Sequence, residues 1–169
     1  MKKLFLMLFL FGTMSPLLAQ ITKPEELKEV ELVAVNYKYL DATTNDEVAV
    51  PVKLLQEKVA KYDLKNSDIY SDDYDTYEVN FFIPQGTVLA AYDKDGKLLK
   101  TVERYKDIGL PSAVMKAVKE KYPDWTVSKD IYLVNYHDEK GIEKRYKLKL
   151  EDKNNNRMRI KVDEKGNFL

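Results

Sequence analysis

The sequence of 169 residues contains no cysteine and only one histidine, His137. The lack of cysteine excludes disulfides, Cys-ligated metal sites and thiol nucleophiles, so the stability has to come from core packing. A zinc site of the usual kind takes several His or Cys ligands, which one histidine does not supply. A base or a metal ligand is one interpretation of His137. Its neighbours Asp138 and Glu139 favour the other, a solvated histidine in a turn.

The chain also lacks the motifs of common enzymes. It has no glycine-rich loop for phosphate, and none of its serines stands in a nucleophile-elbow motif. A serine hydrolase would need a histidine and an acid within reach of the serine as well. We therefore expect a protein that is not an enzyme and that holds no cofactor.

Only the N-terminus carries a long apolar run. Segment 4–11 is apolar and follows two lysines, and the run closes at the small residue Ala19. This order is typical of a secretory signal peptide over residues 1–19, because the run is too short to cross a bilayer as a helix. A retained N-terminal anchor is the alternative. We expect a periplasmic or secreted protein with a flexible leader over residues 20–29 and no stable membrane insertion after signal cleavage.

The two halves of the remaining chain carry opposite net charges. Residues 20–100 hold 10 Lys and no Arg against 9 Asp and 7 Glu, a net charge of −6. Residues 101–169 hold 12 Lys and 4 Arg against 6 Asp and 6 Glu, a net charge of +4. Attraction between the halves explains this asymmetry without a ligand, and a different partner for each half is the alternative. Since the formal charge of the whole chain is +0, we expect no nucleic-acid binding.

Both halves follow the same order of elements. Pro51 opens a helix, Pro111 opens another, and proline suits the first turn of a helix because its missing N–H has no partner there. Apolar runs then lead to two acidic turns that end in glycine, at 93–96 and 163–166. This order predicts two tandem repeats of one supersecondary unit.

The repeats are predicted to span residues 30–100 and 101–169 in an α+β fold, each a helix packed on about three to four antiparallel strands. Segment 31–40 alternates valine and tyrosine with other residues, which predicts a strand. Further strands are expected over 77–83, 87–92, 97–105, 127–136, 146–151 and 157–162. The second helix is expected to bury Val114, Met115, Val118 and Tyr122. Each helix should cover one face of the sheet and leave the other to water or to the second repeat.

Acidic residues gather at two places that have some features of calcium sites. The first group consists of Asp68, Asp72, Asp73 and Asp75. Calcium takes oxygen ligands, but this spacing does not fit the twelve-residue calcium loop and lacks its glycine. We expect a solvated loop, with a calcium- or metal-responsive envelope protein as the alternative. In turn 93–96 the glycine comes too early for a calcium loop, and the recurrence at 163–166 favours turns in which glycine supplies positive φ.

The second half contains a candidate partner surface. Tyr132, Val134 and Tyr136 share one face of a strand. The basic residues that share one face of the next two strands are Lys147, Lys149, Arg157, Arg159 and Lys161. If these faces coincide, they form a tyrosine patch with a basic rim, and Tyr and Arg are favoured in protein interfaces. Alternatively, the tyrosines pack against repeat one and the basic residues are only solvated.

The order of motifs in the second half resembles a known family. Leu110-Pro111 opens the helix, Lys121-Tyr122-Pro123 closes it, Trp125 and strands follow, and an acidic-Gly turn ends the chain. Together with the signal peptide, this is similar to the PepSY-like family of small exported bacterial proteins, which is related in fold to the beta-lactamase-inhibitor protein. The resemblance covers residues 30–169 and implies a secreted or periplasmic module that binds or inhibits peptidases, without established catalytic residues. We therefore expect a non-catalytic module that binds a protein or peptide of the cell envelope.

Overall fold

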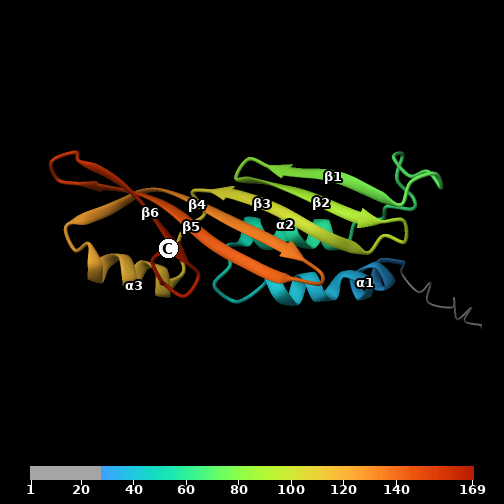
Figure 1. The fold of residues 1–169 in the computed structure, drawn as a ribbon, viewed down its shortest axis with the longest axis horizontal. Helices are drawn as coiled ribbons and strands as arrows, with labels where there is room; N and C mark the ends of the chain where they lie inside the picture. Colours follow the sequence, from blue (N-terminus) through green and yellow to red (C-terminus); the bar gives the residue numbers. More distant parts are fainter. Residues whose placement is uncertain (1–27) are drawn as a thin grey trace, which may run out of the picture.

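The computed structural model describes residues 28–169, with side chains from Asn36 onward. The predicted signal peptide and most of the predicted leader lie outside these residues. The elements are α1 (Lys28–Thr43), α2 (Val50–Ala60), β1 (Thr76–Ile83), β2 (Gly86–Asp93), β3 (Leu98–Lys106), α3 (Ser112–Lys121), β4 (Trp125–His137), β5 (Gly141–Asp152) and β6 (Arg157–Asp163). The fold is α+β, which confirms the predicted class (Figure 1).

The strands form one antiparallel sheet of six strands, in the order β1-β2-β3-β4-β5-β6 (Figure 1). Strands β3 and β4 pair between Lys100 and Lys106 on one side and Ile131 and His137 on the other. This pairing joins the segments before and after α3 in a single sheet, and the predicted boundary between residues 100 and 101 falls inside β3. Strand β4 is central, as its apolar residues on both faces predict.

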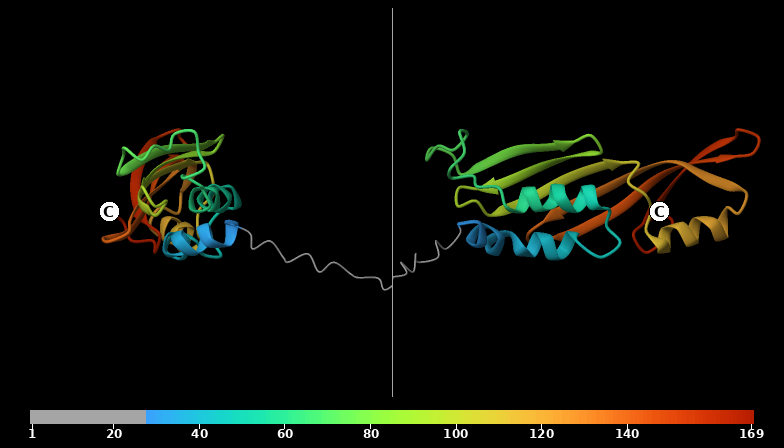
Figure 2. Two further views of the ribbon diagram at one scale, coloured as in Figure 1. Left: turned by 90° about the vertical axis from the view of Figure 1, so that its right-hand side faces the viewer. Right: turned by 180° about the vertical axis from the view of Figure 1, so that it is seen from behind.

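The helices lie on one side of the sheet, and the end-on view shows the sheet curving around them (Figure 2). Strand residues that face the helices are buried, among them Phe81, Tyr105 and Leu148. Helix α2 adds Leu55 and Val59 to the same core. Full burial of an aliphatic or aromatic side chain of this kind stabilises the fold by about 1.5–3 kcal/mol. The face away from the helices is therefore the one left for contacts with other molecules.

Segment 31–40, which was predicted to be a strand, belongs to helix α1. The described side chains of α1 that are buried are Asn36, Tyr39 and Thr43, at the spacing of three and four residues expected for one face of a helix. Tyr39 packs edge-on against Tyr136 of β4, with 5.2 Å between the ring centroids. The strand prediction is wrong because alternating apolar residues also contain a helical stripe, and packing against the sheet decides between the two. The last two residues of the predicted leader also lie in α1.

Proline begins the other two helices, as predicted. Pro51 occupies the first turn of α2, and Pro111 is the N-cap residue of α3. In α3, Val114 and Val118 are buried, but Met115 is 55% exposed, although it was predicted to lie in the buried stripe. The next residue along a helix lies about 100° around the axis, and α3 buries only a narrow face.

Aspartate closes three turns of the sheet with the same contacts. Asp93 Oδ1 accepts hydrogen bonds from the N–H groups two and four residues later, both at 2.9 Å. Asp163 Oδ1 does the same at 2.9 and 2.8 Å, and Asp152 Oδ1 repeats the pattern at 2.9 and 2.8 Å. Gly96 and Gly166 have φ values of 83° and 89°. These contacts confirm that 93–96 and 163–166 are turns in which glycine adopts positive φ.

Candidate binding surface on the open face of the sheet

The face of the sheet that points away from the helices, called the open face below, mixes apolar and basic side chains. One row across five strands consists of Phe82, Thr87, Arg104, Leu133 and Arg145. Phe82 and Val102 are exposed there although they are large and apolar.

A hollow of about 480 Å³ lies on the open face over β3, β4, β5 and β6. Six of the residues that line it are basic: Arg104, Lys129, Lys147, Lys149, Arg159 and Lys161. Ile131 lines it as well, together with parts of Leu148 and Ile160. We call this feature the basic hollow. It contains four of the five basic residues that the sequence singled out as a candidate partner surface, the exception being Arg157.

The register of the strands brings the positive charges together. Lys149 lies between Lys129 and Arg159 on the neighbouring strands, and Lys147 lies opposite Lys161. Directly opposite residues of an antiparallel pair have Cβ atoms about 4.5–5.5 Å apart, and like charges at these positions are destabilising. The fold therefore maintains three like-charged pairs on one surface, at a cost that a bound anion would relieve.

Acidic side chains neutralise the margin of this surface but not its centre. Arg157 pairs with Glu151 at 3.4 Å, and Arg145 pairs with Glu143 at 3.0 Å. None of the six cations of the basic hollow forms an ion pair with an acidic side chain in the part of the chain whose side chains are described. Positive potential is consequently concentrated in a concave site, where it attracts anions most strongly.

Tyr132 and Tyr136, which were predicted to border the basic residues, lie on the opposite face of the sheet. They are only 2% and 4% exposed. Tyr132 stacks on Tyr146 of β5, with 4.6 Å between the ring centroids. Because side chains alternate along a strand, Ile131 and not its tyrosine neighbour faces the basic residues. The predicted tyrosine–basic surface is therefore wrong. Tyr136 packs against Tyr39 of the predicted first repeat, as the alternative expects, whereas Tyr132 packs on Tyr146 of the second.

A buried carboxylate that the sequence analysis missed lies on the helix side of β3. Glu103 is 0% exposed and accepts four hydrogen bonds of 2.8 Å. The donors are Tyr39 Oη, Gln56 Nε2, Thr101 Oγ1 and Tyr105 Oη. Burial raises the pKa of Glu103, and the four hydrogen bonds lower it in part. The alternation of β3 places Glu103 on the same face as Tyr105, which is the signal in the sequence that could have revealed it. Since the group is enclosed, its contacts hold α1 and α2 on the sheet.

His137 ends β4 and takes part in contacts within the adjoining turn. Its Nδ1 lies 3.3 Å from the carboxylate of Asp138 and accepts the N–H of Glu139 at 3.2 Å. Asp138 also pairs with Lys97 at 2.7 Å, and the hydrogen bond from Lys97 lowers the pKa of this carboxyl. His137 is thus the last residue of a strand, paired with Lys100 and Gly141, and not a residue of the turn itself.

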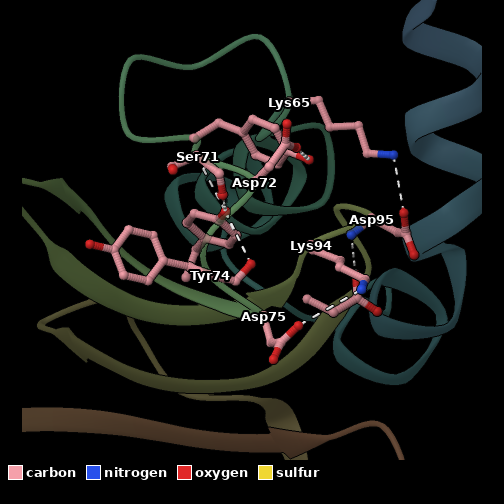
Figure 3. Close-up of polar contacts among 10 residues, drawn as sticks. Lys65, Ser71, Asp72, Tyr74, Asp75, Lys94 and Asp95 are labelled. Carbon is pink, nitrogen blue, oxygen red and sulfur yellow. Dashed lines mark hydrogen bonds and ion pairs between the residues drawn. The ribbon is translucent and has the colours of Figure 1, made fainter.

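The acidic segment between α2 and β1 directs its side chains to separate partners (Figure 3). Tyr70 Oη donates to Asp72 at 3.0 Å, and Asp75 pairs with Lys94 across 3.8 Å. Within the described residues, no three acidic or histidine side chains come together in a way that would hold a metal ion. The geometry therefore offers no support for the calcium-responsive alternative.

Comparison with profiles of known protein families finds no match, and neither does comparison with curated protein sequences. The resemblance to PepSY-like proteins therefore rests on the motifs alone. Among the helices that the structure describes, none is long and apolar enough to cross a membrane.

Proposed function

We propose that this chain is an exported, non-catalytic binding module of the PepSY-like kind, and that its basic hollow binds an acidic segment of a protein or peptide in the cell envelope. The observation that carries the proposal is the group of six cations around one concave site, which no acidic side chain from Asn36 onward neutralises in an ion pair. A periplasmic or secreted location follows from the signal peptide that the sequence predicts.

The residues of the hollow suit carboxylates on an extended chain. Arg104 and Arg159 can each hold a carboxylate with two parallel hydrogen bonds, and the four lysines add positive charge without fixing a geometry. Ile131 offers contact to an apolar side chain of the ligand. Neighbouring strands are about 4.8 Å apart, so the four strands of the hollow span roughly 14 Å. That length corresponds to about four residues of an extended acidic segment.

We also infer that the two halves of the chain are tandem repeats. Tyr92 pairs with Leu98 across the first acidic turn, and Val162 pairs with Phe168 across the second. Each half contains one helix that a proline opens, α2 in the first and α3 in the second. The halves differ in the segment after this helix. In the first half it is the acidic loop between α2 and β1, and in the second half it is strand β4. All lining residues of the basic hollow belong to the second half, which agrees with a function that arose where the copies diverged.

The PepSY-like resemblance directs the search for a partner to envelope peptidases. A module that occupies an acidic segment of a peptidase would inhibit it if that segment lies near the substrate site. Purified protein should then reduce proteolysis in a dose-dependent way. Inertness across a panel of envelope peptidases would remove the inhibitory part of the proposal and leave the binding part intact.

The binding part can be tested with a labelled oligoglutamate peptide and fluorescence anisotropy. The triple variant Lys147→Gln, Lys149→Gln, Arg159→Gln should bind the peptide at least tenfold more weakly than the unchanged chain, and the affinity of the unchanged chain should fall steeply with salt. The control Lys58→Gln, Lys119→Gln, Lys153→Gln removes the same charge elsewhere. If both triple variants lose the same affinity relative to the unchanged chain, net charge and not the hollow is responsible. If neither loses affinity, the hollow does not bind the peptide. Pull-down of envelope proteins with the same variants then identifies partners.

A further inference from the structure

The two edges of the sheet differ in how they are protected. On β6, Arg159 and Lys161 are exposed, and the chain end folds back on the strand. Phe168 forms a bridge to Val162, and the N–H of Leu169 donates to the carbonyl of Lys161 at 3.0 Å. Charged side chains and a covering segment are the usual means by which proteins prevent an edge strand from pairing with another chain.

The opposite edge, β1, lacks this protection. Its eight residues, Thr76–Ile83, pair with β2 in continuous register without a bulge. The strand contains no proline and no basic residue, and its one charge, Glu78, pairs with Lys100 at 3.5 Å. Among the described residues β2 is the only strand that pairs with β1, which lies at the rim of the sheet (Figures 1 and 2). A regular edge of this length, with a single charge that is already paired, is a template for a further strand.

We propose that β1 pairs with β1 of a second copy of this chain, antiparallel and around a two-fold axis at Asn80. In this register Val79 lies opposite Phe81, and Tyr77 lies opposite Ile83, so the apolar helix side continues from one sheet into the other. Glu78 of each copy lies opposite an apolar residue, so the two carboxylates do not face each other. The edge is thus complementary to itself, as a two-fold interface requires.

The backbone of Asn80 is oriented for this contact. In a hairpin closed by two residues, here Pro84 and Gln85, the flanking pair exchanges hydrogen bonds and the pattern then alternates along the strands. Asn80 stands three residues before Ile83, so its N–H and C=O point away from β2. At the axis, the two copies of Asn80 exchange a pair of N–H···O bonds. The dimer contact lies outside the basic hollow, so the dimer proposal does not depend on the proposed function.

Sedimentation equilibrium of the purified chain tests this proposal. We expect a reversible dimer, and we expect Asn80→Pro to raise its dissociation constant at least tenfold, because proline removes both hydrogen bonds at the axis without touching the β1–β2 ladder. A chain that stays monomeric at the highest soluble concentration would overturn the proposal, as would a dimer that Asn80→Pro leaves unchanged.

A second pair of variants tests the register and does not depend on the folding of the proline variant. Asn80→Lys and Asn80→Asp each place two like charges opposite each other at the axis, so each should dissociate more readily than the unchanged chain. Thr87→Lys adds the same charge one strand further in and should leave the dimer intact. An equimolar mixture of Asn80→Lys and Asn80→Asp should form a heterodimer more readily than either variant forms a homodimer. Equal association of the mixture and the separate variants would refute the two-fold axis at Asn80.

Discussion

Replacing the buried carboxylate of Glu103 is the most demanding test of how the helices are held on the sheet. Glu103→Ala leaves the four donors that now meet its oxygens without an acceptor in a dry environment. A buried donor without a partner costs about 1–3 kcal/mol, and removal of one member of a buried charged network costs about 3–5 kcal/mol in total. Glu103→Ala also removes the free-energy cost of burying a charged carboxylate, which offsets part of this destabilisation. We expect the free energy of unfolding to fall by about 3–5 kcal/mol, a large share of the 5–15 kcal/mol typical of a domain.

Glu103→Gln should be much milder, for a reason visible in the same cluster. Gln56 Oε1 is buried and has no hydrogen-bond partner among the residues that the structure describes. If the Gln56 amide turns over, that oxygen can accept from the new amide at position 103. A protonated Glu103 can use the same acceptor, so the neutral form of the carboxyl also has a partner.

The pH dependence of stability follows from the raised pKa of Glu103. A carboxyl whose pKa is higher in the folded state binds its proton more tightly there, so its contribution is complete below the unfolded pKa and is lost as the pH rises through the folded pKa. The free energy of unfolding of the unchanged chain minus that of Glu103→Gln should therefore fall as the pH rises from about 4, by no more than about 1.4 kcal/mol per pH unit. Tyr39, Tyr105 and Gln56 face this group and stay uncharged over that range.

Urea unfolding followed by circular dichroism at several pH values measures both effects, with linear extrapolation to water. Glu103→Ala, Glu103→Gln and the unchanged chain should be compared at each pH. A difference between the unchanged chain and Glu103→Gln that grows with pH would refute the reasoning, because it would mean that the hydrogen bonds outweigh burial and lower the pKa. A loss below about 1 kcal/mol in Glu103→Ala would show that water reaches the cluster.

Three further predictions concern other described contacts. Asn36→Ala removes the acceptor of the 2.7 Å bond from the N–H of Leu98 together with two donor contacts, so urea unfolding should show a loss of about 2–4 kcal/mol. Gly166→Ala should lower the melting temperature more than Gly141→Ala, since both have positive φ but only a Cβ at Gly166 would lie 2.9 Å from the carbonyl oxygen of Ala113; equal shifts would mean that the backbone there moves freely. Calcium titration followed by calorimetry should give no heat of binding and no change in melting temperature, and a clear shift would revive the metal-responsive alternative.

Local chemistry allowed part of the fold to be predicted from the sequence. The positions of Pro51 and Pro111, and the turns that end in Gly96 and Gly166, depend on the backbone preferences of single residues, so no tertiary information was needed. Strand β1 was equally clear, because its apolar and polar residues alternate without exception up to Phe82.

The predictions that are wrong concern sequence patterns that fit two structures, and only tertiary packing decides between the two. Segment 31–40 carries both a strand alternation and a helical stripe, and the decision depends on the sheet that α1 covers. In β4, apolar residues occupy both faces, so the sequence does not say whether Tyr132 or Ile131 faces the core. The basic residues of β5 and β6 were placed together correctly, because charged and apolar residues alternate over 146–151 and over 157–163. Their true neighbour from β3, Arg104, comes from a pairing across α3 that no local pattern reveals.

The order of the strands in the sheet, which equals their order in the chain, has a consequence for folding kinetics. Most strand pairs are hairpins whose contacts are close in sequence, so the entropy lost in closing them is small and folding should be fast for a protein rich in strands. The pairing of β3 with β4 is the exception, because α3 lies between them in the chain. Closure of that one long connection is therefore the natural slow step, at which two preformed three-stranded meanders dock into one sheet.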